Sequence, residues 1–354
     1  MKFNLFEFSD CLSARPPNCP PKDSTRLGCL PPPIPGKLSQ PAMAILSIST
    51  TSSSTSSFSF PIHKPNPRRF NRYRIGMAFA SGVRVTEGEG KLPKLVLTTP
   101  TGSEAELYLF GGCVTSWKPA NGKDLLFVRP DAVFNKKKPI SGGIPHCFPQ
   151  FGPGELQQHG FARNVDWSVA ESGIVDGNTV VTLELKDDPY SRAMWDFSFK
   201  ALYKVILKEK SLATELVVIN NDTKPFSFTT ALHTYFSASV TGAVVKGLKG
   251  CKTLNKDPDP KNPIEGTEYR EAVNFPGLVD CIYLNAPSEL FLENGLGDAI
   301  SIRNTNWSDA VMWNPHLQME ACYKDFVCVE NAKIGKVHLE PDQSWTATQT
   351  LSIV

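Results

Sequence analysis

The sequence predicts an all-β protein, a sandwich of antiparallel sheets with few and short helices. In several segments after residue 86, apolar and polar residues alternate with the period of two that is typical of half-buried strands. Turn-forming residues separate these segments, and no stretch keeps helical spacing for more than about three turns. Short strands joined by turns favour two packed layers of sheet.

The strand candidates follow one another along the chain. The first two are LVLTT (95–99) and AELYLF (105–110). Three longer ones with clear alternation follow: TVVTLELK (179–186), Phe197–Lys208 and TELVVIN (214–220). After the turn-like Asn221–Lys224 come PFSFTTALHTYF (225–236), FVCVE (326–330) and TATQTLSIV (346–354).

Residues 1–86 differ in composition from the rest of the chain. They hold 11 Lys/Arg and 3 Asp/Glu, whereas 87–354 hold 26 and 32. From Met43 the segment is rich in Ser and Thr and then in Arg, as organellar transit peptides are. We therefore expect 1–86 to be a disordered leader with a transit peptide to the chloroplast, Met43 to be the biological start, and 87–354 to form the functional domain.

Composition and motifs exclude several classes of function. The acidic balance of residues 87–354 argues against a non-specific nucleic-acid binder, and no run of about 20 apolar residues indicates an integral membrane segment. The nine cysteines form no CxxC pair and no zinc-spaced cluster, so we expect reduced thiols. The sequence contains no phosphate loop, dinucleotide fingerprint, HExxH or GxSxG motif.

Two histidines lie where site residues are expected. In the strand candidate 225–236, the even positions Phe226, Phe228, Leu232 and Phe236 predict a core face. His233 belongs to the opposite, smaller and more polar face. His159 follows a loop rich in Pro and Gly, a stiff irregular segment of the kind that mounts functional side chains on a β scaffold.

Four motifs in these regions resemble those of one family. They are SGGIPHCFPQFGPGELQQHGFARN (141–164), ALHTYF (231–236), DAVMWNP (309–315) and CVE (328–330). Their order and spacing resemble the glucose-6-phosphate 1-epimerases, a branch of the aldose 1-epimerase or galactose mutarotase-like superfamily, from about Gly112 to the C-terminus. The resemblance implies that residues 87–354 form a large twisted antiparallel β-sandwich with a carbohydrate cleft.

The reaction implied by the resemblance interconverts the α and β anomers of an aldohexose 6-phosphate. A base takes the C1 hydroxyl proton while an acid protonates the ring oxygen, and two groups on opposite sides of the sugar suffice without metal or organic cofactor. By resemblance Glu330 is the base and His233 the acid. His159 then hydrogen-bonds sugar hydroxyls, and Asp309 accepts a hydrogen bond from another hydroxyl.

The phosphate of such a substrate needs local cations on an acidic domain. Arg163 matches one phosphate ligand of the family. A second family arginine precedes the GG of the GGIP motif, where this chain has Ser141, a residue that supplies one hydrogen bond and no charge. The run Lys136–Lys138 is a candidate replacement. The substrate is therefore a hexose 6-phosphate, another sugar phosphate or an unphosphorylated sugar.

Two other functions fit the same fold. One is a non-catalytic carbohydrate-binding or assembly module, and the other is an aldose 1-epimerase acting on free hexose. The presence of His233, Glu330 and His159 together argues against loss of the catalytic site, because a decayed site has no reason to keep both ends of a proton relay. The missing arginine at Ser141 argues weakly in the other direction.

Overall fold

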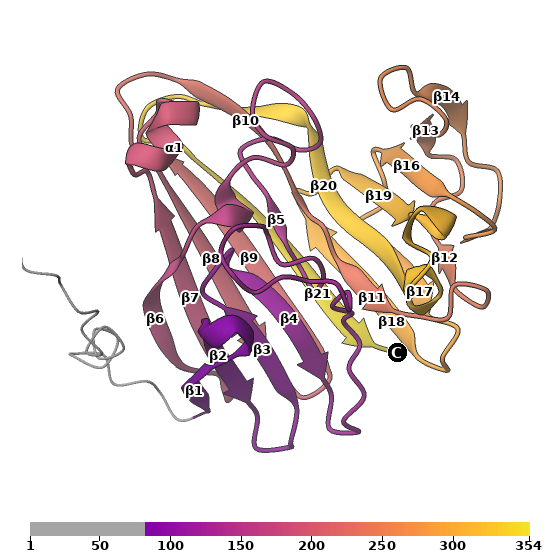
Figure 1. Cartoon of the computed structure of the whole chain (residues 1–354), viewed down its shortest axis with the longest axis horizontal. Helices are drawn as coiled ribbons and strands as arrows, with labels where there is room; N and C mark the ends of the chain where they lie inside the picture. Colours follow the sequence, from indigo (N-terminus) through magenta and orange to yellow (C-terminus); the bar gives the residue numbers. More distant parts are fainter. Residues whose placement is uncertain (1–81) are drawn as a thin grey trace, which may run out of the picture. The chain divides into compact units, whose positions relative to one another are not determined.

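The computed structural model of the protein describes residues 82–354. The predicted leader, including Met43, falls almost entirely outside the described residues. The first strand, β1 (Val83–Glu87), begins four residues before position 87, at which the domain was expected to start. Three antiparallel sheets make up the described part of the chain (Figure 1).

The first two sheets have four and eight strands. The four-stranded sheet consists, in spatial order, of β1, β2 (Pro93–Thr98), β3 (Glu104–Tyr108) and β4 (Cys113–Lys118). The path of the eight-stranded sheet runs through β14 (Ile264–Thr267), β13 (Lys252–Asn255), β16 (Val279–Leu284), β19 (Asp309–Asn314), β20 (Phe326–Leu339), β10 (Phe226–Leu232) and β5 (His146–Cys147). Its remaining strand, β11 (Tyr235–Ser237), also pairs with β20.

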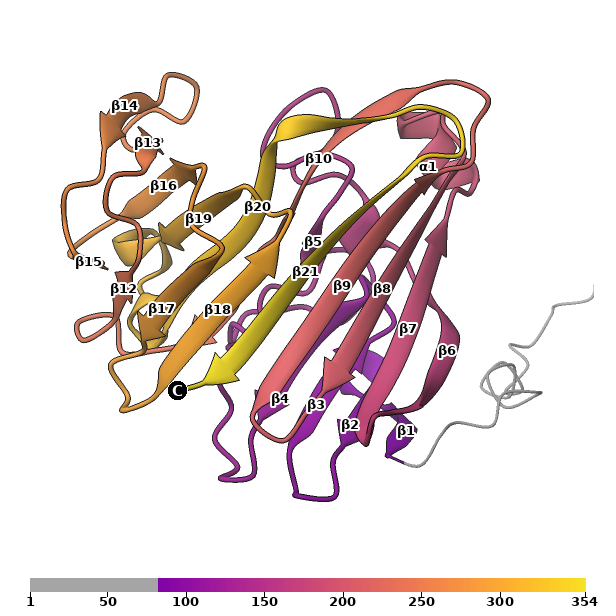
Figure 2. The same ribbon diagram turned by 180° about the vertical axis from the view of Figure 1, so that it is seen from behind.

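The third sheet has nine strands and is the broad layer seen in Figure 2. In spatial order it contains β15 (Ala272–Asn274), β12 (Val244–Lys246), β17 (Glu289–Glu293), β18 (Ala299–Thr305), β21 (Ser344–Ile353), β9 (Ser211–Asn220), β8 (Phe199–Leu207), β7 (Asn178–Lys186) and β6 (Ser168–Val175). The predicted strands at 179–186, 197–208 and 214–220 are three consecutive members of this layer.

The two smaller sheets lie against the nine-stranded sheet and form the sandwich that the sequence predicts (Figures 1 and 2). One continuous apolar cluster joins all three sheets; it includes Leu107 of β3, Val329 of β20 and Tyr203 of β8. Each of these side chains is at most 1% exposed. Burial of alternate residues from both layers is the main contribution to the stability of such a sandwich.

The predicted strand 225–236 is divided in two by a break at His233 and Thr234. Leu232 pairs with Asn331, and Tyr235 pairs with Cys328, so the register on β20 continues unchanged across the break. The predicted faces are confirmed, because Leu232 lies in the main core while Tyr235 packs in a separate cluster on the other face.

Helices are few and short, as predicted. The α-helix α1 (Pro189–Met194) begins with a capping box in which the Asp188 carboxylate accepts a hydrogen bond from the Ser191 amide. Single 3₁₀ turns occur at Glu89–Lys91, Ala162–Asn164, His316–Met319 and Tyr323–Asp325. Within residues 82–354, no helix combines the length and the apolar character that crossing a membrane requires.

Candidate active site

His233 and Glu330 meet on the outer face of the eight-stranded sheet. The constant register of β20 against β10 and β11 puts Glu330 directly opposite His233. The imidazole Nε2 lies 3.4 Å from the carboxylate Oε1. The sequence-based expectation set these groups on opposite sides of a sugar, whereas the structure brings them into contact side by side.

The pair lies in a cavity of about 380 Å³. Small-molecule sites generally occupy about 300–1,000 Å³. Residues of β11, β16, β19 and β20 line it together with His233, and residues between positions 129 and 163 form much of the remaining lining. Five of the six predicted site residues line it, namely Ser141, His159, Arg163, His233 and Glu330.

Burial shifts both members of the pair toward their neutral forms. Loss of solvation, together with the nearby positive charge of Arg163, lowers the pKa of His233 to about 3. Loss of solvation also raises the pKa of Glu330 well above its usual value, against the opposing charges of Lys256 and Arg163. A single proton shared by the two groups is therefore favoured on the carboxylate.

Each member of the pair also has a polar atom without a hydrogen-bond partner. Within residues 82–354, the buried His233 Nδ1 and Glu330 Oε2 make no hydrogen bond. An unpaired buried polar atom costs free energy, and a functional role is one of the explanations for it; both of these atoms belong to residues that line the cavity, where a polar ligand can supply the missing partners. This observation favours a site that binds a polar ligand over a purely structural ion pair.

Aromatic rings fix the imidazole of His233. The Tyr235 ring stacks on it at a centroid distance of 4.9 Å and an interplanar angle of 15°. The Trp313 ring meets it edge-on at 5.6 Å and 80°. Both aromatic residues belong to the motifs that carried the family resemblance, but neither was singled out as a site residue. Their contacts restrict the orientation of the ring and add packing energy.

His159 lies on a loop that borders the cavity. Its backbone has φ of 66°, an uncommon conformation for a residue other than glycine and one that recurs at functional sites. The Gly152 amide donates a hydrogen bond of 3.1 Å to Nδ1, which leaves Nε2 as the proton-bearing nitrogen of the neutral ring. Burial and the neighbouring charges lower the pKa of His159 to about 2, so the ring is neutral; its Nε2 lies 3.4 Å from the Gln158 side-chain nitrogen.

Arg163 and Ser141 lie at the wall of the cavity. Arg163 Nη2 donates to the Gln158 carbonyl oxygen at 2.9 Å, and its buried Nε has no hydrogen-bond partner within residues 82–354. Ser141 is held by the glycines that follow it. At Gly143, with φ of 68°, an added Cβ would lie 2.0 Å from the Val114 carbonyl oxygen, so only glycine permits this approach.

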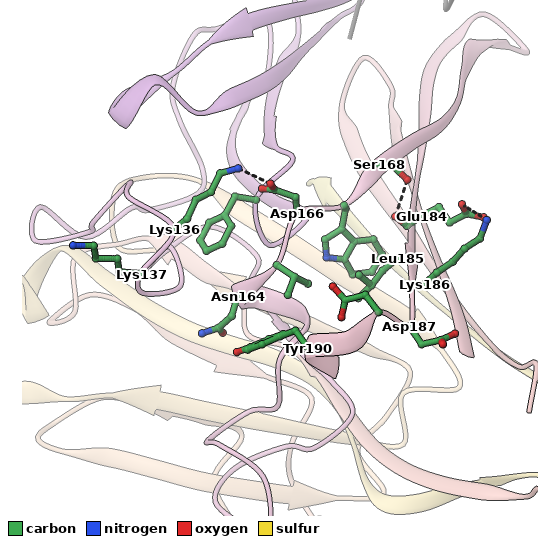
Figure 3. A pocket seen from close by; sticks show the side chains of 14 residues that line it. Lys136, Lys137, Asn164, Asp166, Ser168, Glu184, Leu185, Lys186, Asp187 and Tyr190 are labelled. Carbon is green, nitrogen blue, oxygen red and sulfur yellow. Dashed lines mark hydrogen bonds and ion pairs between the residues drawn. The ribbon is translucent and has the colours of Figure 1, made fainter. Parts of the chain in front are cut away.

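The run Lys136–Lys138 divides between two pockets. Lys138 lines the cavity of the histidines, whereas Lys136 and Lys137 line a separate pocket of about 700 Å³. Figure 3 shows this larger pocket, in which Lys136 pairs with the Asp166 carboxylate and Lys137 points away. No histidine lines it. Its greater volume does not make it the better candidate, and at most Lys138 of the run can replace the missing arginine.

Asp309 is the predicted residue that the structure does not bring into this cavity. Its Oδ1 accepts a hydrogen bond from the Asn285 amide at 3.1 Å. Its Oδ2 accepts from the Ser308 hydroxyl at 2.8 Å and from the Ile334 amide at 3.0 Å. Only 5% of Asp309 is exposed. Both carboxylate oxygens therefore hold neighbouring backbone in place, and the geometry gives Asp309 a structural role.

Sequence reasoning missed the cavity residues Lys256 and Asp280. The two form an ion pair with a distance of 2.9 Å between Lys256 Nζ and Asp280 Oδ1. Asp280 shares a strand face with the apolar Ile282 and Leu284. A single carboxylate on an apolar strand face is unusual, so the sequence pattern alone could have marked Asp280 as a candidate site residue. Asp280 adds a second carboxylate acceptor for hydroxyl groups. Within residues 82–354, no group of three or more His, Cys, Asp or Glu side chains is arranged to hold a metal ion.

The chain is similar to known proteins over most of its length. Residues 93–352 match the family model described as "Aldose 1-epimerase". A protein of Cenchrus ciliaris described as "Putative glucose-6-phosphate 1-epimerase" is 36% identical over 301 residues, which cover 78% of this chain and 88% of that protein. A protein of Salmonella typhimurium with the same description is 31% identical over 242 residues, covering 64% of this chain and 79% of its own length.

Solved structures agree with the fold. A crystal structure of a "putative mutarotase" from Salmonella typhimurium superposes with a TM-score of 0.68 at 26% identity, over 77% of this chain and 97% of that one. The galactose 1-epimerase of Lactobacillus acidophilus has the same fold, with a TM-score of 0.60 at 13% identity over 77% of this chain and 98% of its own. Fold, family match and relatives agree: the chain belongs to the aldose 1-epimerase family.

Proposed function

We propose that this protein interconverts the α and β anomers of glucose 6-phosphate or a closely related aldohexose 6-phosphate. The observation that carries the proposal is the buried contact of His233 with Glu330 in a sugar-sized cavity. The relatives described as glucose-6-phosphate 1-epimerases support the choice of substrate.

The adjacent placement of the pair suits ring opening. The C1 hydroxyl oxygen and the ring oxygen are both bonded to C1, so their proton donor and acceptor are also expected to be neighbours. Glu330 takes the C1 hydroxyl proton and His233 gives its proton to the ring oxygen, while the bond between C1 and the ring oxygen breaks to leave an open-chain aldehyde. After rotation about C1–C2 the ring closes on the other face of the aldehyde, and both protons return.

Neighbouring groups influence the position of the proton on the pair of His233 and Glu330 and the binding of the sugar. Because burial favours the shared proton on Glu330, it must move to His233 across the 3.4 Å contact before the carboxylate can act as a base. The positive charges of Lys256 and Arg163 lower the pKa of Glu330 and so stabilise its ionised form, while the same two charges lower the pKa of His233 and oppose its protonation. Neutral His159 donates from Nε2 to a sugar oxygen, and Asp280 accepts from a hydroxyl.

An anomer-exchange measurement tests the proposal. The full chain is added to glucose 6-phosphate and, separately, to glucose, and magnetisation exchange between the anomeric C1 protons is recorded by NMR. We expect faster exchange for the phosphorylated sugar. Acceleration of glucose alone would remove phosphate from the substrate and leave an aldose 1-epimerase for free hexose. Acceleration of neither sugar would favour the carbohydrate-binding module.

We further propose that the basic segment 1–86 carries a chloroplast transit peptide and that translation begins at Met43. The support is compositional: 11 basic and 3 acidic residues, with Ser and Thr followed by Arg. A fluorescent fusion of residues 43–86 should enter plastids, and mass spectrometry of the mature protein should find an N-terminus after Met43. A mature chain that keeps residues 1–42 would contradict both parts of this proposal.

A further inference from the structure

Arg129 lies beside the position where the family's second arginine is replaced. Its amide donates a hydrogen bond of 3.0 Å to the carbonyl oxygen of Ser141, and the preceding residue, Val128, forms a β-bridge with Gly142. Arg129 and Ser141 are thus neighbours across a short antiparallel pair, where side chains lie close enough to serve one site. Both residues line the cavity that holds His233 and Glu330.

The guanidinium of Arg129 is held mostly out of solvent, with 15% of the side chain exposed. It binds the Asp131 carboxylate through two hydrogen bonds, from Nε at 2.9 Å and from Nη2 at 2.5 Å. This two-pronged geometry is the one in which arginine also binds phosphate. The bound Asp131 carboxylate shows that the guanidinium of Arg129 is oriented to bind two oxygens of one anion.

Asp131 competes with a phosphate for the Arg129 guanidinium. Its side chain is 62% exposed, so water can solvate the carboxylate once the guanidinium releases it. It lies outside the cavity lining, whereas Arg129 lies within it. A phosphate with close to two negative charges therefore has an advantage over the single carboxylate. Arg129 can turn from Asp131 or bind phosphate through Nη1, which has no hydrogen-bond partner recorded within residues 82–354.

Lys256 differs in its surroundings from Arg129 and Arg163, although all three line the cavity. Lys256 is neutralised by Asp280 and lies near the carboxylate of Glu330. Arg129 and Arg163 are arranged differently, since the positive charges of both act on the Tyr235 hydroxyl and lower its pKa against the larger effect of burial. Both arginines line the same cavity as Tyr235, the ring that stacks on His233.

We infer that Arg129 supplies the second guanidinium of a phosphate clamp with Arg163, so that the charge absent at Ser141 enters from the neighbouring segment. Asp131 occupies the clamp until a phosphorylated sugar displaces it. This inference rests on the proposed function, because it assigns the part of the same cavity that recognises the phosphate. It makes the cavity selective for phosphorylated over free hexose.

Substitution of the arginine tests the clamp. In Arg129→Gln, the ratio of kcat/KM for glucose 6-phosphate to kcat/KM for glucose should fall about ten- to hundredfold, because the lost bonds are charge-assisted. Arg303→Gln is the matched control: it removes the same charge from an exposed arginine that pairs with Glu289 outside the cavity. A ratio in Arg129→Gln equal to that of Arg303→Gln would overturn the inference.

Two further variants exploit the neighbouring positions. Adding Ser141→Arg to Arg129→Gln should restore most of the lost preference for glucose 6-phosphate over glucose, because residue 141 lies next to residue 129 across the short antiparallel pair. Failure to restore it would place the phosphate elsewhere and overturn the shared clamp. Asp131→Asn should tighten binding of glucose 6-phosphate several-fold by removing the competing charge, and an unchanged or weaker affinity would contradict displacement.

A binding measurement separates this inference from the proposed function. Calorimetric titration of glucose 6-phosphate into His233→Asn and into His233→Asn/Arg129→Gln measures the clamp without catalysis. An affinity at least tenfold weaker in the double variant supports the clamp even if the protein accelerates neither sugar, in which case only the proposed reaction fails. Equal affinities, with both variants shown to be folded by thermal melting, would refute the clamp even if the wild-type protein is an active epimerase.

Discussion

His233 Nε2 and Glu330 Oε1 lie 3.4 Å apart because the register of β20 against β10 and β11 continues across the break at His233 and puts the two residues directly opposite each other. The relationship is set by backbone register and not by flexible loops. A register that also places core residues cannot slip without exposing them, so the packing of the sandwich fixes the distance between donor and acceptor. Predictions for each member of the pair follow from this geometry.

His233→Asn and Glu330→Gln should each slow anomer exchange at least about a hundredfold, because each removes one of the two proton-transferring groups. Both substitutions nearly preserve shape, and the variants should remain folded. NMR exchange rates on glucose 6-phosphate check the expectation. His338→Asn serves as a control, since His338 is an exposed histidine of the same strand, β20. Near-normal exchange in either site variant would remove its residue from the mechanism.

The pH profile of kcat at saturating sugar should lack the acid limb of an ordinary histidine near pH 6.5, whereas kcat/KM also contains the second ionisation of the substrate phosphate at about pH 6. Burial lowers the pKa of His233 to about 3, so the pair gains its second proton only well below that pH. Activity should instead fall on the alkaline side, as the pair loses its single proton through the raised pKa of Glu330. His159, Arg163, Lys256 and Asp280 surround the pair and tune both limbs.

A profile measured from about pH 5 to 9 decides the question. Constant kcat from pH 5 to 7 is expected, with the alkaline limb above this range. An acid limb centred near the ordinary histidine pKa would show that burial does not control His233, and Glu330→Gln should abolish or displace the alkaline limb.

Glu330→Gln should also raise the stability of the protein at neutral pH. A carboxyl group whose pKa is raised on folding binds more protons in the folded than in the unfolded state, so its contribution to the free energy of unfolding falls as pH rises through the interval between the two pKa values. Glu330→Gln has no ionisable carboxyl group at this position, so its free energy of unfolding does not fall in this way as pH rises. Its advantage in denaturant unfolding should be present at pH 7 to 8 and fade toward pH 4. A variant less stable than wild type at every pH would contradict this account.

Much of the fold follows from local sequence, whereas much of the site does not. Alternation in 179–186 predicts both the strand β7 and the buried positions of Val181 and Leu183. The sequence alone cannot reveal that Arg129 stands beside Ser141 or that Lys256 pairs with Asp280, since these contacts depend on chain segments that meet only after folding. His233 was found because a polar ring on a strand face is visible locally.

The role of Asp309 illustrates the same limit. Its motif points to the cavity, and its side chain does lie on the outer face of β19, but hydrogen bonds from Asn285 and Ile334 take up the carboxylate. Asp309→Ala would leave two partly buried amides, those of Asn285 and Ile334, without this partner. We expect a loss of about 1–3 kcal/mol in the free energy of unfolding. KM for the sugar should change much less. A large rise in KM with intact stability would instead place this carboxylate on the substrate.

Gln349 is expected to hold the catalytic pair from the far side of the sheet. Its Nε2 donates to Thr234 Oγ1 at 3.2 Å and to Asn331 Oδ1 at 2.9 Å. These partners are the chain neighbours of His233 and Glu330, and their side chains point the opposite way, into the core. Gln349 itself is fully buried on β21 of the nine-stranded sheet. The Gln349 side-chain amide thus connects the neighbours of both His233 and Glu330 to the nine-stranded sheet.

Gln349→Leu should therefore lower kcat about tenfold with little change in KM, because small displacements of reacting groups are costly. Loss of the two buried hydrogen bonds should also reduce the free energy of unfolding by about 1–3 kcal/mol. Gln349→Glu preserves shape and Gln349→Asn shortens the reach, so their comparison separates charge from length. A Gln349→Leu variant that loses stability but keeps kcat would show that the amide only joins the layers and leaves the spacing of His233 and Glu330 to backbone register.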